Sequence, residues 1–443
     1  MRSRLFSLPV ALILAVAVLQ PAMASDIEIL TTPAGIEVWL KQEPSIPIVS
    51  IEVAFAGGAS LDPDGREGLA NMVTGLLDEG AGDLDSYAFQ DKLDALSIRM
   101  SFNVGRDAFY GSLTTLAANL DEAEALFAMA LNNPRFDEEP VERIRGQITV
   151  GLLRDQEDPS SRAWRAWSEA AFPGHPYGRP VDGTPDSVST ITADDLRGYV
   201  DGNFTRDRLF VSIVGAITPE RATALVDTVF ADLPFQGVAL TTVDTAVGAG
   251  GVNVIAMDVP QSAIVFGLAG LMRGDPDYYA GAVLNKVVGG GGLSTRLFEE
   301  VRKKRGLAYA TGSSLFAYDH AGLWVGSAGT QNARAGETLQ VIRDVLNDVA
   351  ENGVTDEEVD DAKAYMTGSF PLRLDSNQSI ANMLLAIQLN DLGVDYIERR
   401  NDYIEAVTAE DIQRVARRIL DADNLLVVVA GQPVGITPSV SID

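Results

Sequence analysis

Short runs rich in apolar and β-branched residues alternate along the chain with longer stretches in which apolar residues recur every three or four positions. The short runs favour strands, and the longer spacing favours amphipathic helices. We expect strands at residues 48–55, 98–104, 262–268 and 307–315. We expect helices at residues 67–78, 120–131, 276–288 and 335–352. Because helices and strands are mixed without strict alternation, the pattern predicts an α+β fold with mainly antiparallel sheets.

Parts of this pattern occur twice. Ile191–Leu196 (ITADDL) recurs as Val407–Ile412 (VTAEDI), and Leu209–Gly215 (LFVSIVG) recurs at the same offset as Leu425–Gly431 (LLVVVAG). Ordered matches at one offset indicate two tandem homologous domains. We predict an N-terminal domain at residues 25–238 and a C-terminal domain at residues 252–443. The linker between them is expected near residues 235–252, where residues 241–251 are rich in Gly, Ala and Thr.

The repeated segments also carry signals for helix starts. Thr192 and Thr408 are expected N-caps, with Asp195 and Asp411 three positions later, which is close to a capping box. Acidic triplets at residues 137–139 and 356–358 are each expected to open another helix, because acidic side chains are favourable at a helix N-terminus.

The N-terminal segment, residues 1–24, has the pattern of a secretory signal peptide. Arg2 and Arg4 precede an apolar run at residues 8–19, and Ala22-Met23-Ala24 follows as a small-x-small cleavage site. The alternative is a transmembrane anchor, but a comfortable span needs about 20 apolar residues. We therefore expect a periplasmic or secreted protein with no membrane span after cleavage.

The amino-acid composition excludes several kinds of catalytic site, metal site and partner. The 443 residues include no Cys and only two His, His175 and His320. These counts exclude disulfides, thiolate nucleophiles, Cys-ligated metals and a zinc site built on two histidines at helical spacing. With 62 acidic and 34 basic residues the formal net charge is −28, which argues against nucleic acid as a partner. A chain that needs no disulfides suits a bacterial periplasm.

Several motifs, in order along both halves, resemble those of one enzyme family. Residues 56–60 (AGGAS) and 65–76 (GREGLANMVTGL) are similar to the active-site helix of the pitrilysin (inverzincin) zinc metallopeptidases and the segment before it. Residues 175–180 (HPYGRP), 294–298 (STRLF) and 305–309 (RGLAY) are also typical of this family. The resemblance implies two tandem domains like those of the mitochondrial processing peptidase. Each is a mixed, mainly antiparallel sheet packed with helices.

The zinc motif of this family is missing. The family's helix carries H-x-x-E-H, which supplies two zinc ligands and the general base. Aligned on residues 68–70, these positions are Asn71, Thr74 and Gly75, and the place of the family's third ligand, a Glu, falls near Leu152. Asn, Thr, Gly and Leu do not hold zinc at neutral pH or lower the pKa of a bound water. We therefore expect this chain to bind no metal or other cofactor.

A second set of family residues is intact in the C-terminal half. A Ser-Thr pair at residues 294–295 is expected to cap a helix that passes Val301 and stops at Gly306, where a strand follows. This arrangement would bring Arg302 and Tyr309 to one end of the sheet. The resemblance implies that both are catalytic, binding substrate carbonyls and stabilising the tetrahedral oxyanion. The alternative is that Arg302 only stabilises the negative helix end and Tyr309 is half-buried core.

Four glycines, residues 289–292, precede this predicted helix. No Lys-Ser or Lys-Thr follows them, so the segment is not a phosphate-binding loop. One interpretation is a flexible turn between two helices. The other rests on a resemblance to the glycine-rich loop in the non-zinc subunit of the mitochondrial processing peptidase, and implies that Gly290, Gly291 and Gly292 bind substrate peptide.

The missing zinc residues and the intact Arg302 and Tyr309 lead to two hypotheses. The first is the non-metal subunit of a two-chain periplasmic zinc peptidase, a heterodimer in which a homologue with H-x-x-E-H supplies the zinc and peptide is enclosed between the chains. The alternative is a non-enzymatic structural or peptide-binding homologue. A metal-free hydrolase is not expected, because no nucleophile, base and orienting group are recognisable together. His175 and His320 are expected in a loop and a turn.

Overall fold

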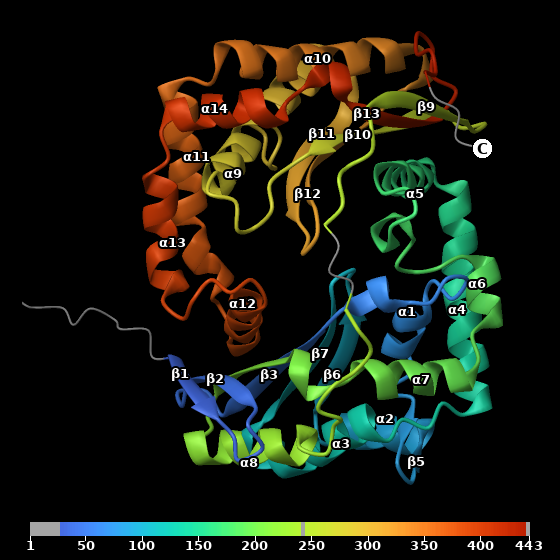
Figure 1. Cartoon of the computed structure of the whole chain (residues 1–443), viewed down its shortest axis with the longest axis vertical. Helices are drawn as coiled ribbons and strands as arrows, with labels where there is room; N and C mark the ends of the chain where they lie inside the picture. The colour runs from blue at the N-terminus through green and yellow to red at the C-terminus, as the bar shows by residue number, and fades with distance from the viewer. Residues whose placement is uncertain (1–26, 241–243, 440–443) are drawn as a thin grey trace, which may run out of the picture.

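The computed structural model describes residues 27–240 and 244–439, so the predicted signal peptide and residues 241–243 of the predicted linker lie outside the described residues. Figure 1 shows two halves, one above the other, each with a sheet and flanking helices. Residues 232–240 and 244–250, between the halves, form neither helix nor strand. The architecture is the predicted α+β fold of two similar domains.

The N-terminal domain is built on a sheet with the strand order β1-β2-β8-β3-β7-β6. β2 and β8 are parallel, and the other neighbours are antiparallel. All residues of β3 except its two ends are buried, so both faces of the sheet are covered. The strands are β1 (Ile27–Thr31), β2 (Glu37–Gln42), β3 (Ile48–Ala56), β6 (Arg99–Val104), β7 (Ala108–Leu116) and β8 (Leu209–Gly215), with a separate hairpin of β4 (Gly80–Ala81) and β5 (Leu84–Asp85).

The C-terminal domain repeats this plan in the order β11-β12-β10-β13-β9. β9 and β13 are parallel, as β2 and β8 are, and the other neighbours are antiparallel. Gly215 and Gly431, at matching positions of the two repeats, end β8 and β13 with φ of 148° and 146°, and a side chain on either would collide with the adjacent strand. The strands are β9 (Gly251–Ala256), β10 (Gln261–Ala269), β11 (Ala308–Ala317), β12 (Gly322–Gln331) and β13 (Leu426–Gly431).

Each sheet packs one face on helices of its own domain, and an apolar core fills the layer between them. The N-terminal helices are α1 (Leu69–Thr74), α2 (Ser86–Ala95), α3 (Leu120–Asn132), α4 (Glu138–Glu157), α5 (Pro159–Ala171), α6 (Pro185–Thr190), α7 (Ala193–Asn203) and α8 (Pro219–Phe230). The C-terminal helices are α9 (Tyr278–Val288), α10 (Ala335–Asn352), α11 (Asp356–Gly368), α12 (Asn377–Leu389), α13 (Tyr396–Glu405), α14 (Ala409–Ile419) and the π-helix η5 (Phe298–Lys303).

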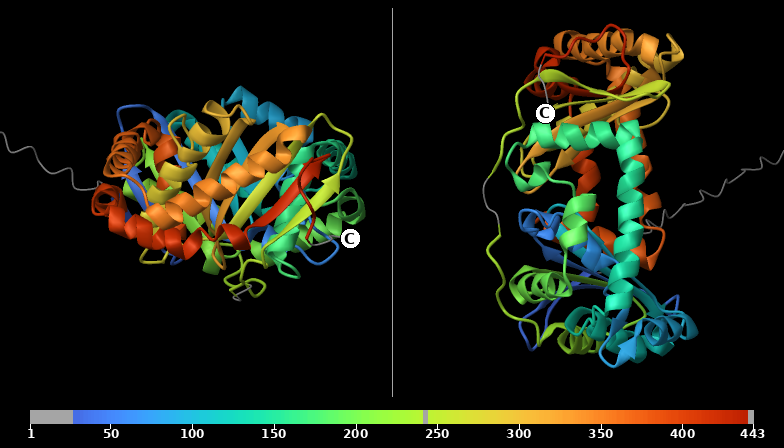
Figure 2. Two further views of the ribbon diagram at one scale, coloured as in Figure 1. Left: turned by 90° about the horizontal axis from the view of Figure 1, so that it is seen from above. Right: turned by 90° about the vertical axis from the view of Figure 1, so that its right-hand side faces the viewer.

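The other face of each sheet is covered by a helix from the opposite domain. α5 packs on β10 and β13, where Trp167 is buried and its Nε1 donates to the Leu426 carbonyl over 3.1 Å. α12 packs on β3 and β8, where the Ser212 hydroxyl donates to the Ala381 carbonyl over 2.7 Å. Figure 1 shows α5 against the upper sheet and α12 against the lower one. In the right-hand view of Figure 2, α4 rises from the N-terminal domain and leads into α5.

The repeated motifs form the predicted helix starts. Thr192 and Thr408 each accept a hydrogen bond from the backbone three residues later, and Asp195 and Asp411 accept one in return, so both capping boxes are present. The acidic triplets open α4 and α11, as predicted.

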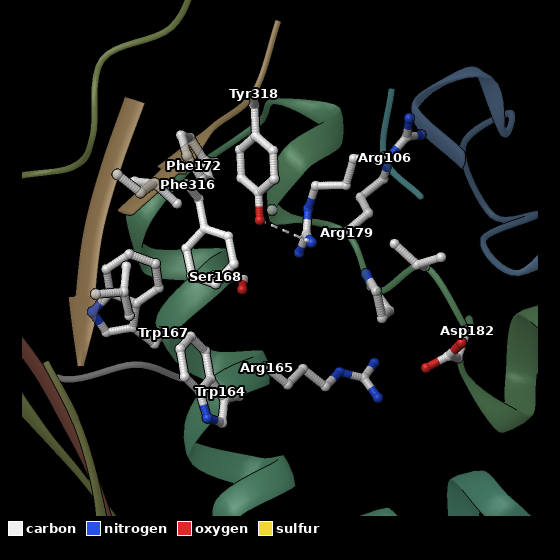
Figure 3. Close-up of a pocket in the computed structure, with 15 residues that line it drawn as sticks. Arg106, Trp164, Arg165, Trp167, Ser168, Phe172, Arg179, Asp182, Phe316 and Tyr318 are labelled. Atoms are coloured by element: carbon white, nitrogen blue, oxygen red, sulfur yellow. Dashed lines mark hydrogen bonds between the residues drawn. The ribbon is translucent and has the colours of Figure 1, made fainter. Parts of the chain in front are cut away.

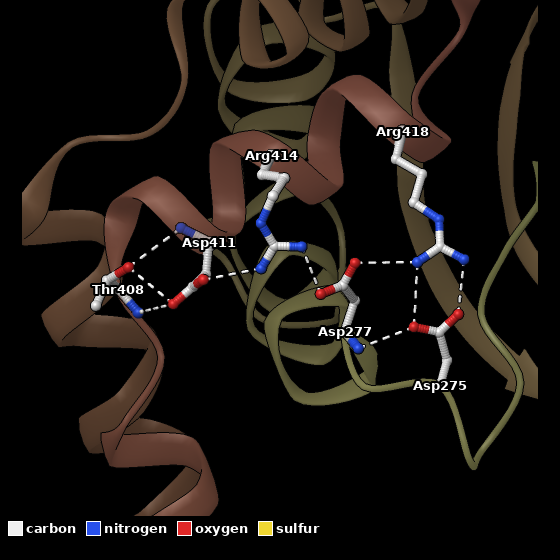
Figure 4. A network of polar contacts seen from close by, with 6 residues as sticks. All are labelled: Asp275, Asp277, Thr408, Asp411, Arg414 and Arg418. Carbon is white, nitrogen blue, oxygen red and sulfur yellow. Dashed lines mark hydrogen bonds and ion pairs between the residues drawn. The ribbon is translucent and has the colours of Figure 1, made fainter.

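Ion pairs attach α14 to the start of α9 (Figure 4). Arg414 contacts Asp277 over 2.5 Å, and Arg418 contacts Asp275 over 2.7 Å. The arginine side chains are about half exposed, whereas both carboxylates are largely covered. The pairs therefore orient α14 across the end of α9 more than they stabilise the fold.

One predicted helix is shorter than expected. The sequence predicts a helix over residues 67–78, but α1 spans only Leu69–Thr74. Gly75 has a low helix propensity, and the Thr74 hydroxyl donates to the Asn71 carbonyl over 2.7 Å, which competes with the helical hydrogen bond. The other predicted strands and helices are confirmed, with small shifts at their ends, except that the helix predicted before Gly306 contains a π turn. Within the described ranges, no helix is long and apolar enough to cross a bilayer.

Candidate functional site

At the positions where the pitrilysin-like family carries its zinc ligands and general base, this chain has packed or hydrogen-bonded residues instead. Asn71 and Thr74 are half-buried on α1, and the Thr74 hydroxyl is bound to the Asn71 carbonyl. An added Cβ at Gly75 would lie 3.1 Å from the Ile144 side chain of α4, so this side chain would have to move by a few tenths of an ångström to admit a larger residue. Leu152 of α4 is buried in the N-terminal core. These residues do not fit a zinc ion.

The two histidines lie at the contact between the domains. Among the residues that the structure describes, no three His, Cys, Asp or Glu side chains are grouped so as to hold a metal ion. His175 and His320 lie beside Tyr177, with ring centroids 4.6 and 6.2 Å away. His175 Nδ1 accepts from the Tyr177 amide, and the Tyr177 hydroxyl accepts from the His320 amide. Both histidines therefore have a packing role in a loop and a hairpin turn.

The structure brings Arg302 and Tyr309 into direct contact. Arg302 lies on η5, and Tyr309 lies near the start of β11. The guanidinium carbon of Arg302 is 4.8 Å from the Tyr309 ring centre and 4.9 Å from that of Phe298, within the range of cation–π attraction. Tyr309 is 81% exposed, which rules out the alternative that it is half-buried core.

The backbone that carries Arg302 differs from the predicted helix. Its central turn is a π-helix, in which the Lys304 amide donates to the Glu299 carbonyl over 2.9 Å. The Thr295 hydroxyl accepts from the Phe298 amide over 3.4 Å, and Gly306, with φ of 59°, makes the predicted turn into β11. Single π turns are rare in proteins, and many of those that do occur lie at functional sites.

The charges around Arg302 distinguish it from its neighbours. The three cations that follow, residues 303–305, all form ion pairs with Glu299 or Glu300. Within the described part of the chain, Arg302 forms no ion pair. A guanidinium without a carboxylate partner, beside an exposed phenol, is available to bind an external carbonyl or anion.

The glycine segment connects α9 to η5 and meets the strand that carries Tyr309. Gly291 and Gly292 have left-handed φ values of 81° and 97°, which favour glycine. The Gly289 carbonyl accepts from the Ser313 amide of β11, and Lys286 Nζ donates to the Gly291 carbonyl, each over 2.8 Å. Among the described residues, no hydrogen bond, ion pair or ring contact joins the segment to the arginine–tyrosine pair.

A cavity that the sequence does not predict lies between the domains (Figure 3). Its volume is about 450 Å³, and its walls come from α5, residues 178–182, the turn between β6 and β7, and the β11–β12 hairpin. The sequence signal for it is the W-R-A-W run of α5, which gains meaning only when the fold places it opposite the other walls. The aromatic and cationic lining residues are Trp164, Trp167, Phe172, Phe316, Tyr318, Arg106, Arg165 and Arg179.

Comparison with known families matches both halves of the chain. Residues 37–185 match the family model described as insulinase (peptidase family M16), and residues 190–366 match the model described as peptidase M16 inactive domain. The solved structure of a peptidase M16 inactive domain from Pseudomonas fluorescens is 27% identical, with a TM-score of 0.87, and the match covers 93% of this chain and 99% of that one.

Relatives of similar length include one named as a zinc protease and one named as a non-peptidase homologue. An uncharacterized zinc protease from Streptomyces coelicolor is 28% identical, covering 88% of this chain and 86% of the relative. The non-peptidase homologue YmxG of Helicobacter pylori is 25% identical, covering 85% of this chain and 90% of the relative.

The residues on α1 and α4 show that this chain alone lacks the zinc-binding set and is catalytically incomplete. The family matches, the duplicated fold and the shared order of motifs together show that the chain belongs to the pitrilysin family, peptidase family M16.

Proposed function

We propose that this chain is the non-metal subunit of a two-chain zinc peptidase that acts outside the cytoplasm. The observation that carries the proposal is the contact between Arg302 and an exposed Tyr309, in a chain whose own zinc helix has no metal ligands. A homologue with H-x-x-E-H would supply the zinc and the general base, and peptide would be held between the two chains.

Arg302 and Tyr309 carry the groups that such a partner site needs from outside. A peptide carbonyl oxygen gains negative charge when its carbon is attacked. The exposed Tyr309 hydroxyl can donate a hydrogen bond to that oxygen, and the guanidinium of Arg302 can bind a neighbouring carbonyl. Because Arg302 has no competing carboxylate partner among the described residues, its donors remain available to the substrate.

Gly290, Gly291 and Gly292 are proposed to contact the peptide. A backbone without Cβ atoms lets another chain approach closely, and the segment meets the same strand, β11, as Tyr309. Gly292→Ala adds a Cβ that meets only the end of the Lys286 side chain, but its φ of 97° also strains the backbone. We expect this substitution to raise KM more than it lowers kcat.

The proposed location outside the cytoplasm rests on residues 1–24, which have the pattern of a signal peptide. Cleavage would remove them and leave Ser25 as the first residue of the mature chain. Intact-mass spectrometry of the protein purified from its native cell tests this proposal. A mature chain that begins at Ser25 in the periplasmic or secreted fraction supports it, whereas an uncleaved chain that begins at Met1 contradicts it.

The partnership is tested by purifying the tagged full chain from native cell extract and measuring zinc in the complex. We expect a zinc-bearing homologue to co-purify. The mixture should cleave a quenched fluorescent peptide, and neither chain alone should do so. In that mixture Tyr309→Phe should lower kcat by roughly 10²- to 10³-fold, as expected for loss of one oxyanion donor.

Two matched variants control for nonspecific effects. Tyr87 on α2 is 82% exposed, so Tyr87→Phe removes an equally exposed hydroxyl elsewhere. Arg305→Ala removes a neighbouring guanidinium that already pairs with Glu300. If Tyr309→Phe and Arg302→Ala behave like these controls, the catalytic role is wrong and the alternative, a structural or peptide-binding homologue, is favoured.

A further inference from the structure

The inter-domain cavity has one wall of aromatic side chains. Trp164 and Phe172 come from α5 and its end, while Phe316 and Tyr318 come from the β11–β12 hairpin of the other domain. Figure 3 shows these rings along one side of the open space. The volume of about 450 Å³ lies within the roughly 300–1,000 Å³ of pockets that bind small molecules.

Two guanidinium groups reach the same space from different elements. Arg106 donates through Nη1 to the Tyr318 hydroxyl over 3.4 Å, and its guanidinium carbon lies 5.4 Å from that ring centre. Arg165 extends from α5 on the far side of the space (Figure 3) and, within the described residues, has no hydrogen bond or ion pair. Neither arginine is matched by a carboxylate contact in the described structure.

The remaining charges of the lining do not cancel this positive charge. Arg179 pairs with Asp64 over 2.7 Å and points away from the centre of the cavity in Figure 3. Asp182 is the one acidic residue of the lining, and it interacts electrostatically with Arg106. Arg106 also donates through Nε to the Tyr177 carbonyl over 3.1 Å, whereas Arg165 has no polar partner among the described residues. Two guanidinium groups and one carboxylate leave the lining with a net positive charge. A positive cavity in a chain of net charge −28 attracts a small anion selectively over the rest of the surface.

We propose that this cavity binds a ligand that joins a carboxylate to an aromatic or bulky apolar group. The carboxylate lies between Arg106 and Arg165, whose planar donors suit two oxygens. The apolar group packs against Trp164, Phe172 and Tyr318. A free aromatic acid and the C-terminal residue of a peptide share this chemistry. The site is separate from the Arg302–Tyr309 pair and needs no partner chain. This proposal can therefore be tested independently of the peptidase proposal.

Because the walls come from both domains, the bound ligand also joins them. Binding to the folded state alone raises the unfolding temperature of the whole chain with ligand concentration. Trp164 and Trp167 are two of the four tryptophans and both line the cavity, so ligand binding changes the intrinsic fluorescence.

The test titrates the mature chain with N-acetyl-L-phenylalanine, its C-terminal amide, and the tetrapeptide Gly-Gly-Gly-Phe. Fluorescence and isothermal calorimetry report binding. We expect the acid to bind with a Kd below about 1 mM and the amide to bind at least about 10-fold more weakly. Tighter binding of the tetrapeptide assigns the site to peptide C-termini, and tighter binding of the acetylated amino acid assigns it to free aromatic acids.

The decisive variant is Arg165→Gln, because Arg165 makes no described polar contact that the fold would lose. We expect it to weaken the acid about 10-fold or more and to leave the amide unchanged. Arg162→Gln on the same helix is the matched control, since Arg162 donates to the Gln156 carbonyl instead. Equal binding of acid and amide, an unchanged Kd in Arg165→Gln, or no binding of any probe overturns the proposal.

Discussion

Glu52 makes the stability of this protein depend on pH. It lies in the middle of β3, is 3% exposed, and accepts a hydrogen bond from the Ser112 hydroxyl over 2.6 Å. Burial raises the pKa of Glu52 from its ordinary value of 4.5 to about 7, and hydrogen bonds from Ser112 and from Gln378 of α12 oppose this only in part. The carboxyl is therefore at the contact between the N-terminal sheet and the helix supplied by the other domain.

The direction of the effect follows from proton binding. Between about pH 4.5 and pH 7 the folded protein keeps a proton on Glu52 that the unfolded chain has released. The contribution of Glu52 to the free energy of unfolding therefore falls as pH rises through this window and is constant above it. A change in pKa from 4.5 to about 7 corresponds to a loss of roughly 3 kcal/mol.

The perturbation is Glu52→Gln, which keeps a polar group of the same shape but never ionises. We expect the variant to match the wild type near pH 4.5 and to exceed its free energy of unfolding by up to about 3 kcal/mol near pH 8. Urea unfolding followed by circular dichroism across this range measures the difference. Glu28→Gln, at an exposed position of the same sheet, controls for general charge. A difference between Glu52→Gln and wild type that is constant with pH would refute the reasoning.

Other predictions concern packing and helix ends, and urea unfolding measures each. Trp167→Ala should cost about 3–5 kcal/mol, because it empties the space between α5 and the C-terminal sheet. Gly267→Ala should cost about 1–3 kcal/mol, since the new Cβ would collide with the Trp167 ring. It should cost less in the Trp167→Ala background, where only the contacts of 3.0 Å with the Trp324 carbonyl and the Val325 side chain remain. Thr408→Ala should cost about 1 kcal/mol through loss of its cap. Arg418→Ala should cost less than about 1 kcal/mol, because this side chain is 49% exposed.

Features encoded locally could be predicted from the sequence. The capping boxes at Thr192 and Thr408 depend on residues three positions apart, and the turn after η5 depends on Gly306 alone. Arg302 and Tyr309 are close in sequence, so one turn decides their contact. These short-range relations explain why the helix ends and the approach of Arg302 to Tyr309 could be predicted, whereas the proposed role of the pair comes from the family resemblance.

Features that depend on distant contacts were missed. The cavity joins Arg106 and α5 to a hairpin of the other domain, so no single segment of the sequence indicates it. The π turn of η5 was also not predicted, because the amphipathic pattern of a single turn does not distinguish it from an α-helix. Which sheet α5 or α12 covers cannot be read from its own apolar face, since both sheets have similar buried strands.

The crossing of α5 and α12 has a consequence for the history and the handling of this protein. Two copies of a single ancestral domain could bury the same surfaces by each laying this helix on the other's sheet, so the present chain has the geometry of a domain-swapped dimer fused end to end. A cut in the linker would then release two fragments, each missing a helix that the other holds. Separately, each would expose an apolar sheet face and aggregate. Mixed during refolding, they should reassemble.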